Sequence, residues 1–349
     1  MPALEDLIAG LLAGNPRALA RLLTHIENDT DDARRALAAL YAHTGRAHLI
    51  GVTGAPGTGK STLVNALALA YRQRERTVGI IAVDPTSPFS GGAILGDRIR
   101  MRDLAGDRGV FIRSMATRGS LGGLARATAN AVRALDAAGF DGVLIETVGA
   151  GQSEVEIARA AHTTLVVEAP GLGDDVQAIK AGILEIADVL VVNKADRPDA
   201  RHTVRALKAM LDLGSSRPTE MWHHGQMLDV AAATTEPDGT SWQTPVLETV
   251  ATTGTGIDSL VETIDAHRAY LRQTGQIVRW ERQRLAAELE ERLRDSLLTR
   301  FLTNTPQAAL QDVLDQLATR QIDPHSAVQR LLGDDAPHHA ISRSEQLQE

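Results

Sequence analysis

The sequence contains no cysteine among its 349 residues. Disulfide bonds, thiolate nucleophiles and cysteine metal ligands are therefore excluded. Phe, Trp and Tyr together make up 3% of the residues, which disfavours nucleic-acid binding by stacking of bases on aromatic side chains. The formal net charge of −8 also lacks the basic excess that is typical of proteins binding nucleic acids or anionic membranes.

Long apolar runs are missing as well. None approaches the roughly 20 residues that a membrane-spanning helix needs. The first residues, Met1 to Asp6, lack the basic region that opens a signal peptide. We therefore expect a cytoplasmic protein with no nucleic-acid and no membrane partner. Its length suits one large domain with additions, or two domains.

One glycine-rich stretch matches the phosphate-binding pattern G-x-x-x-x-G-K-[ST]. It lies between an apolar run, Leu49 to Val52, and a helical pattern that begins near Lys60, which is the strand–loop–helix context that the motif requires. Lys60 is expected to reach the β- and γ-phosphates, Ser61 to ligate Mg²⁺ and Thr62 to contact the α-phosphate. The predicted phosphate-binding residues are Gly54, Ala55, Pro56, Gly57, Thr58, Gly59, Lys60, Ser61 and Thr62.

Residues 47–270 alternate short apolar runs with helical patterns, which is typical of right-handed βαβ units. Uninterrupted apolar runs suit strands that are buried on both faces of a parallel sheet. The predicted strands are Leu49–Thr53, Val78–Val83, Val110–Ser114, Gly142–Glu146, Thr164–Glu168, Val189–Asn193 and Pro245–Val250. We predict an α/β fold of the P-loop NTPase type, G-domain-like, with a mostly parallel sheet and helices on both faces. Ligands of such sheets lie beyond the carboxyl ends of the strands.

Helical patterns flank this predicted domain on both sides. Leucines at helical spacing predict an N-terminal helical extension over residues 1–46, which we interpret as a packing brace. A second apolar stripe, from Leu285 to Phe301, predicts a helical arm over residues 271–333. Periodicity leaves open whether this arm braces its own chain or pairs with a second copy. The polar tail, residues 334–349, is predicted to be disordered.

A second motif, N-K-x-D, ends another predicted strand at Asn193, Lys194 and Asp196. The Asp196 carboxylate can accept hydrogen bonds from guanine N1–H and the 2-amino group, whereas adenine offers neither donor and would be rejected. Asn193 is expected to contact the base edge and anchor nearby loops, and the stem of Lys194 to cover the base. A backbone contact to guanine O6 is expected from Val250, Ala251 and Thr252. Together the two motifs predict a site for GTP and GDP.

Magnesium prefers hard oxygen ligands. The candidate ligands are Ser61, Asp84, Asp97 and Glu146. Asp84 and Glu146 end predicted strands, and Asp97 lies in a glycine-rich loop. The alternative for each carboxylate is a helix cap or a turn residue.

Hydrolysis is predicted to be slow in the isolated protein. Gly149 would let a backbone N–H approach the γ-phosphate, and it joins Lys60 and Glu146 as a candidate catalytic residue. No glutamine follows Gly149 directly, at the position where small GTPases orient the attacking water. Gln152 and Lys180 are the side chains that could enter the hydrolytic site instead, and a partner could accelerate the reaction.

These residues resemble the metallochaperone branch of the P-loop GTPases, in which a glutamate replaces the usual aspartate at the fourth strand. The likeness is carried by residues 146–154 (E-T-V-G-A-G-Q-S-E), 83–88, 91–97 and 173–182. Together they look like the MeaB/ArgK/MMAA group, GTPase chaperones of adenosylcobalamin-dependent acyl-CoA mutases. The likeness covers nearly the whole chain except the polar tail. It departs from the group's pattern at Val250, where serine is common.

The resemblance implies a GTPase that gates adenosylcobalamin loading, helps remove damaged cofactor and protects the mutase, typically methylmalonyl-CoA mutase. It implies that the helical arm mediates homodimerisation and that residues 173–182 form a third switch sensing the mutase. Lys180 would be the functional lysine of that switch; the alternative is that it only solvates a helix face. Cobalamin would be held by the partner, because this chain lacks a D-x-H-x-x-G motif. Methylmalonyl-, isobutyryl- and ethylmalonyl-CoA mutases all stay open as partners.

Competing functions are less consistent with the sequence. A P-loop kinase, the transport-kinase label that part of this group has carried, would need an acceptor pocket that no motif indicates. A signal-recognition-type GTPase would carry an aspartate-led fourth-strand motif and a methionine-rich domain, whereas this chain has Glu146 and 6 methionines. Nickel or zinc carriers of the branch use cysteine motifs or histidine-rich tracts, and here only the pairs His223-His224 and His338-His339 occur.

Overall fold

The computed structural model describes residues 4–84, 104, 106–116, 123–147, 160–171, 186–214, 221–223, 226–228 and 241–333. The chain divides into two compact units, Met1–Trp280 and Glu281–Glu349. Within the described ranges, every helix is too short or too polar to cross a membrane.

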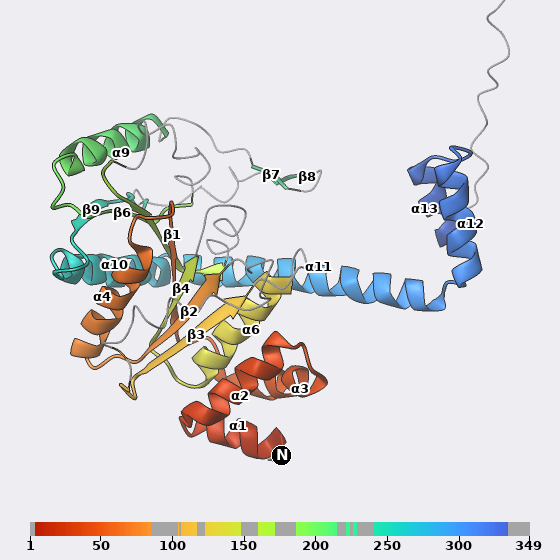
Figure 1. Ribbon diagram of the computed structural model, residues 1–349, viewed down its shortest axis with the longest axis horizontal. Helices are drawn as coiled ribbons and strands as arrows, with labels where there is room; N and C mark the ends of the chain where they lie inside the picture. Colours follow the sequence, from red (N-terminus) through yellow and green to blue (C-terminus); the bar gives the residue numbers. More distant parts are fainter. Residues whose placement is uncertain are drawn as a thin grey trace, which may run out of the picture. The chain divides into compact units, whose positions relative to one another are not determined.

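The centre of the first unit is a sheet of seven parallel strands in the order β3-β2-β4-β1-β5-β6-β9 (Figure 1). Its strands are β1 (His48–Thr53), β2 (Val78–Asp84), β3 (Val110–Ala116), β4 (Gly142–Thr147), β5 (Thr163–Glu168), β6 (Val189–Asn193) and β9 (Val246–Thr249). In register, Val52 lies opposite Glu146, and Asn193 lies opposite Thr249. The carboxyl ends that carry the predicted motifs therefore meet at one edge of the sheet.

Helices cover both faces of this sheet. α4 (Lys60–Gln73) and α10 (Ile257–Gln273) pack on one face, while α6 (Gly123–Ala137) and α9 (Ala200–Gly214) pack on the other. Alternating strand residues serve the two layers: in β4, Leu144 joins the α4 core, whereas Val143 and Ile145 join the α6 core. Because both faces are buried, the strands read as continuous apolar runs.

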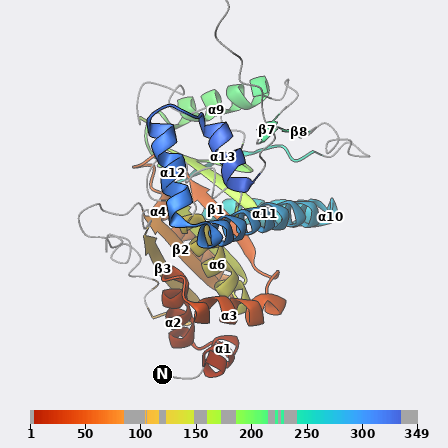
Figure 2. The same cartoon turned by 90° about the vertical axis from the view of Figure 1, so that its right-hand side faces the viewer.

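The three N-terminal helices lie beside α6 in both views of the molecule (Figure 1 and Figure 2). They are α1 (Leu4–Leu12), α2 (Pro16–Glu27) and α3 (Asp31–Leu40), followed by a short 3₁₀ turn, Tyr41–His43. Their apolar faces share one core with α6 and strands β2 to β4. Arg113 of β3 pairs with Glu27 of α2 at 2.5 Å, which ties the helices to the edge of the sheet.

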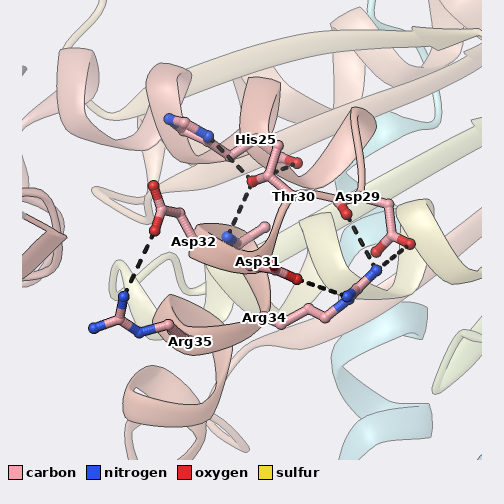
Figure 3. Close-up of polar contacts among 8 residues, drawn as sticks. His25, Asp29, Thr30, Asp31, Asp32, Arg34 and Arg35 are labelled. Atoms are coloured by element: carbon pink, nitrogen blue, oxygen red, sulfur yellow. Dashed lines mark hydrogen bonds and ion pairs between the residues drawn. The ribbon is translucent and has the colours of Figure 1, made fainter.

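The connection between α2 and α3 shows why α3 begins where it does (Figure 3). Thr30 is the N-cap residue, and its Oγ1 accepts a hydrogen bond from Ala33 N at 3.2 Å. Such a cap stabilises a helix by about 1 kcal/mol. Arg34 adds contacts to Asp29 and Asp31, each at 2.8 Å, but these ion pairs are exposed and contribute little. The cap therefore matters more than the charges around it.

The second unit is helical. The unit boundary falls within α11 (Gln276–Asn304), which is followed by α12 (Gln307–Ala318) and α13 (Pro324–Leu332). Asp323 caps α13 by accepting hydrogen bonds from the backbone N–H groups of His325 and Ser326. Val313 and Ala327 are buried in this unit. Much of its leucine surface is exposed: Leu289, Leu293, Leu297, Leu298, Leu302, Leu314 and Leu332.

The predicted α/β fold is confirmed. All seven predicted strands are present, and their observed ends differ from the predicted ones by no more than two residues. A short antiparallel hairpin, β7 (Met221–His223) and β8 (Gln226–Leu228), was not predicted. The predicted disordered tail, residues 334–349, lies outside the described residues.

Candidate functional site: a guanine-nucleotide site

The phosphate-binding loop leaves β1 through backbone conformations that require glycine. Gly54 has φ +137°, and a Cβ atom there would collide with the carbonyl oxygen of Val167 on β5. Gly59 has φ +93°, and a Cβ atom there would lie 2.6 Å from Asn193 Nδ2. The loop backbone therefore lies very close to the ends of β5 and β6. This is the close approach that a backbone cradle for phosphate needs.

Lys60 is the first residue of α4 and is buried, with 6% of its surface exposed. Its ammonium group donates to the Gly54 carbonyl at 2.7 Å and to the Ala55 carbonyl at 3.0 Å. Thr58, also buried, closes the loop by donating from Oγ1 to the Ala55 carbonyl at 3.0 Å. The cation and the N-terminus of α4 thus both favour an anion at the loop.

Ser61 and Glu146, two of the four predicted magnesium ligands, lie together. Ser61 Oγ donates to Glu146 Oε1 at 2.5 Å, although the two residues are 85 positions apart. Glu146 is 1% exposed. Beside them, Thr147 Oγ1 donates to Thr53 Oγ1 at 3.3 Å and holds the end of β4 against the end of β1. A hydroxyl and a carboxylate at one point are the hard oxygen donors that Mg²⁺ prefers.

The N-K-x-D residues begin at the end of β6, beside the phosphate-binding loop. Asn193 Nδ2 donates to the Thr58 carbonyl at 2.9 Å, and Asn193 Oδ1 accepts from Ala251 N at 3.1 Å. Lys194 has a left-handed φ of +57°, and its ammonium group donates to the Gly57 carbonyl at 2.6 Å. The structure therefore brings together the predicted phosphate and base residues.

The other residues predicted to contact the guanine base lie on either side of the Asn193–Thr58 contact. Asp196 is exposed in the turn after β6. Val250, Ala251 and Thr252 start the turn after β9, which Val250 N closes by donating to the Thr255 carbonyl at 3.0 Å. Pro56 and Thr62 are exposed beside the loop. An open Asp196 next to a fixed Asn193 suits a carboxylate that must meet the edge of an incoming base.

One residue of this site was missed from the sequence. Thr249, the last residue of β9, is fully buried, and its Oγ1 donates to Asn193 Oδ1 at 3.3 Å. Its carbonyl accepts from Ala195 N at 3.0 Å. A hydroxyl residue directly before the predicted base-contact segment was the available signal. Thr249 and Ala251 fix the orientation of the Asn193 amide, so that Nδ2 faces Thr58.

Several predicted residues lie outside the described residues: Asp97, Gly149, Gln152, Lys180 and the whole segment 173–182. For Asp84 the structure describes the backbone at the end of β2 and not the side chain. Among the described residues no cluster of three or more histidine or acidic side chains forms a metal site. Ser61 and Glu146 are the predicted ligands that the structure places together.

A phosphate-binding loop and a guanine-reading motif, joined at one edge of a parallel sheet, define the class of this protein: it is a P-loop GTPase. The family model described as methylmalonyl Co-A mutase-associated GTPase MeaB matches residues 19–306. The chain therefore belongs to the MeaB family.

Known relatives agree with this assignment. A putative GTPase of Pyrococcus horikoshii is 44% identical over 335 residues, which cover 95% of this chain and 98% of that protein. A protein of Caenorhabditis briggsae named methylmalonic aciduria type A homolog, mitochondrial, is 35% identical over 56% of this chain and 51% of its own length. The crystal structure of an LAO/AO transport system kinase superposes with a TM-score of 0.66 at 25% identity, covering 95% of this chain and 97% of that one.

Proposed function

We propose that this GTPase is a cytoplasmic metallochaperone of an adenosylcobalamin-dependent acyl-CoA mutase, most simply methylmalonyl-CoA mutase. It gates cofactor loading, supports repair of damaged cofactor and protects the mutase, while the partner holds the cobalamin. The observation that carries the proposal is the contact of Asn193 with Thr58, which joins the predicted base residues to the phosphate-binding loop. It occurs in a chain whose family is described as mutase-associated. The name of the Caenorhabditis relative points in the same direction.

Nucleotide binding would use the contacts around the loop. Lys60 is held beside the phosphate position and turns its charge to the β- and γ-phosphates. Asp196 accepts from guanine N1–H and the 2-amino group, while Asn193 keeps the base turn and the loop at a fixed separation. Because Asn193 holds the base turn against the loop before the nucleotide arrives, little ordering cost is left for these two turns on binding.

Mg²⁺ fits the donor set that the structure places together. Ser61 and Glu146 supply two hard oxygens, and Asp84 and Asp97 are the further ligands that we propose. The ion, when bound, neutralises phosphate charge. Glu146 also orders the Ser61 hydroxyl by accepting its hydrogen bond. Gly149 and Lys180 complete the proposed hydrolytic group, with slow turnover until the mutase docks.

We further propose that the helical arm forms a homodimer. On α11 the side chains of Leu289, Leu293 and Leu297 recur every four residues and are 54% to 68% exposed. No residue of this 29-residue helix is buried within the chain. A surface of this kind indicates a partner helix. Changing Leu293→Glu and Leu297→Glu together should give a monomer by light scattering. Glu290→Gln, which breaks only an exposed ion pair with Arg294, should leave the mass unchanged.

The chaperone role is tested by measuring free phosphate released from GTP, with and without the acyl-CoA mutase of the same organism. We expect slow turnover that rises with mutase concentration and saturates. Lys60→Ala is the control, since it should remove both the basal and the stimulated rates while the protein stays folded.

A rate of GTP hydrolysis that no acyl-CoA mutase changes would contradict the chaperone proposal. It would leave the GTPase assignment unaffected. Transfer of the γ-phosphate to a protein, in place of its release, would favour the alternative function, a P-loop kinase.

A further inference from the structure

The outer side of α9 carries three basic side chains at helical spacing. Arg201, Arg205 and Lys208 are four and three residues apart, so they lie along one side of the helix over about 10 Å. All three are exposed, while Leu207 is fully buried against strands β5 and β6. We call Arg201, Arg205 and Lys208 the basic face of α9.

This face is basic in a chain that is acidic overall. Asp and Glu outnumber Lys and Arg by 44 to 36 in the whole sequence, whereas residues 197–212 contain four Lys or Arg residues and two Asp residues. Within the described ranges, no hydrogen bond or ion pair engages the charged groups of the basic face. α11 differs, because Glu288 and Glu290 pair there with arginines four residues further on. The charge of the basic face is therefore available to a partner.

The stability of α9 does not account for these charges. Arg201 and Arg205 are like charges four residues apart, an arrangement that destabilises a helix. Arg201 is also the second residue of α9, where the positive end of the helix dipole disfavours a cation. Asp212 lies near the other end, where the negative end of the dipole disfavours an anion. The charges thus follow the opposite order to the one that would stabilise the helix.

We propose that the basic face of α9 is a docking surface for an acidic patch on the acyl-CoA mutase, an inference that rests on the proposed function. A compact row of three cations fits a local acidic patch on a protein. A nucleic acid or an anionic membrane would also meet the rest of a chain whose net charge is −8, and that charge would repel it. Opposite charges across an interface speed up association and orient the two partners.

The position of α9 places a docked partner beside the predicted guanine site. The helix begins at Ala200, four residues after Asp196. In the connection between them, Arg197 N donates to the Lys194 carbonyl at 3.0 Å, and Ala200 N donates to the Arg197 carbonyl at 3.2 Å. Two short turns therefore connect the basic face to the residues predicted to read the base.

The test compares two variants that each reverse two charges. Arg201→Glu with Arg205→Glu reverses the basic face, and α9 should stay folded because the glutamate at position 201 suits the positive end of its dipole. Arg17→Glu with Arg21→Glu on α2 is the matched control, because these arginines are also exposed, four residues apart and near the start of a helix. The net charge changes equally in both variants. α2 and α9 lie at opposite ends of the first unit in both views (Figure 1 and Figure 2).

Association of the GTP-bound protein with the mutase is followed by stopped-flow fluorescence at about 0.02 M and about 0.5 M salt. At low salt we expect the α9 variant to associate about tenfold more slowly than the wild type, and the α2 variant to stay within about twofold of it. The difference should shrink at high salt, where charges are screened. Basal GTP hydrolysis should be the same in all three proteins, because the substituted arginines lie outside the nucleotide site.

The possible failures of this test are distinguishable. Equal association rates of the two variants would overturn the role of the basic face and leave the proposed function unaffected. A loss as large at high salt as at low salt would contradict electrostatic docking. If the wild type neither binds the mutase nor responds to it, the proposed function fails, and the docking proposal fails with it.

Discussion

Asn193 donates its side-chain amide to the carbonyl of Thr58 at 2.9 Å, and this contact joins the base-reading motif to the phosphate-binding loop. The oxygen of the same amide accepts from Ala251 N at 3.1 Å. One buried side chain thus holds three turns that come from distant parts of the sequence. A substitution that disturbs either contact of Asn193 should therefore weaken binding of both the base and the phosphates.

The first prediction concerns Thr249, whose hydroxyl donates to Asn193 Oδ1 at 3.3 Å. Thr249→Val keeps the shape and removes this buried hydrogen bond, which is worth about 1 kcal/mol. We expect GDP to bind about fivefold more weakly, since 1.4 kcal/mol corresponds to about tenfold in affinity. Titration with a fluorescent GDP analogue measures this. Thr249→Ser keeps the hydroxyl and should bind like the wild type; equal binding by Thr249→Val would show that Thr249 does not position Asn193.

The second prediction concerns the left-handed glycine at the start of α4. Gly59→Ala places a Cβ atom 2.6 Å from Asn193 Nδ2 at φ +93°, so the Asn193–Thr58 contact must move. Gly275→Ala is the matched control, because φ is +68° there and no described heavy atom beyond its chain neighbours lies within 4 Å of the added carbon. The control should lose about 1–2 kcal/mol of unfolding free energy, the cost of a left-handed conformation for alanine. Gly59→Ala should lose more and also bind GDP poorly. Similar GDP binding by the two variants would contradict the close packing at Gly59.

The third prediction follows from the depressed pKa of His48, which burial, together with neighbouring positive groups, holds well below its unfolded value of 6.5. Below pH 6.5 the unfolded state binds a proton that the folded state does not, so stability falls on acidification by about 1.4 kcal/mol per pH unit. Between about pH 4 and 6.5, His267 adds the same slope, and Asp188 opposes it because the folded state holds the extra proton. The contributions of His267 and Asp188 offset each other.

Urea unfolding at several pH values, compared between variants, tests the predicted contribution of each side chain to the pH dependence of stability. His48→Gln and His267→Gln should each flatten the dependence of stability on pH relative to the wild type, whereas Asp188→Asn should steepen it. Other titrating groups contribute equally to all four proteins and cancel. If His48→Gln followed the wild-type curve, His48 would have to take up its proton in the folded state.

The strands were predictable from the sequence because burial on both faces leaves continuous apolar runs, as at Val189 to Val192. The hairpin of β7 and β8 was missed because its strands have three residues each, too few for a periodic pattern. The sequence predicts a helical arm over residues 271–333. The division into compact units falls after Trp280, inside α11, where the helical pattern continues without a break signal.

The site was predictable from the sequence where its functional residues are adjacent in the chain, as in Gly59-Lys60-Ser61 and Asn193 to Asp196. Contacts between distant residues were less visible. Thr249 reads as one more β-branched strand residue, and its partner is 56 positions away. The contacts that join His48, Thr163, His267 and Asp188 likewise unite residues that no spacing rule connects. Asp97, Gly149 and Lys180 stay predictions.

The measurement that tests the central claim most directly is the nucleotide preference of Asp196→Asn. The guanine site predicts that this variant loses GTP hydrolysis and binding, and hydrolyses xanthosine triphosphate instead, because the C2 carbonyl of xanthine can accept from the new amide. The wild type should show the opposite preference in the same phosphate-release assay. Unchanged GTP affinity and turnover in Asp196→Asn would remove Asp196 from the site and contradict the guanine-specific assignment.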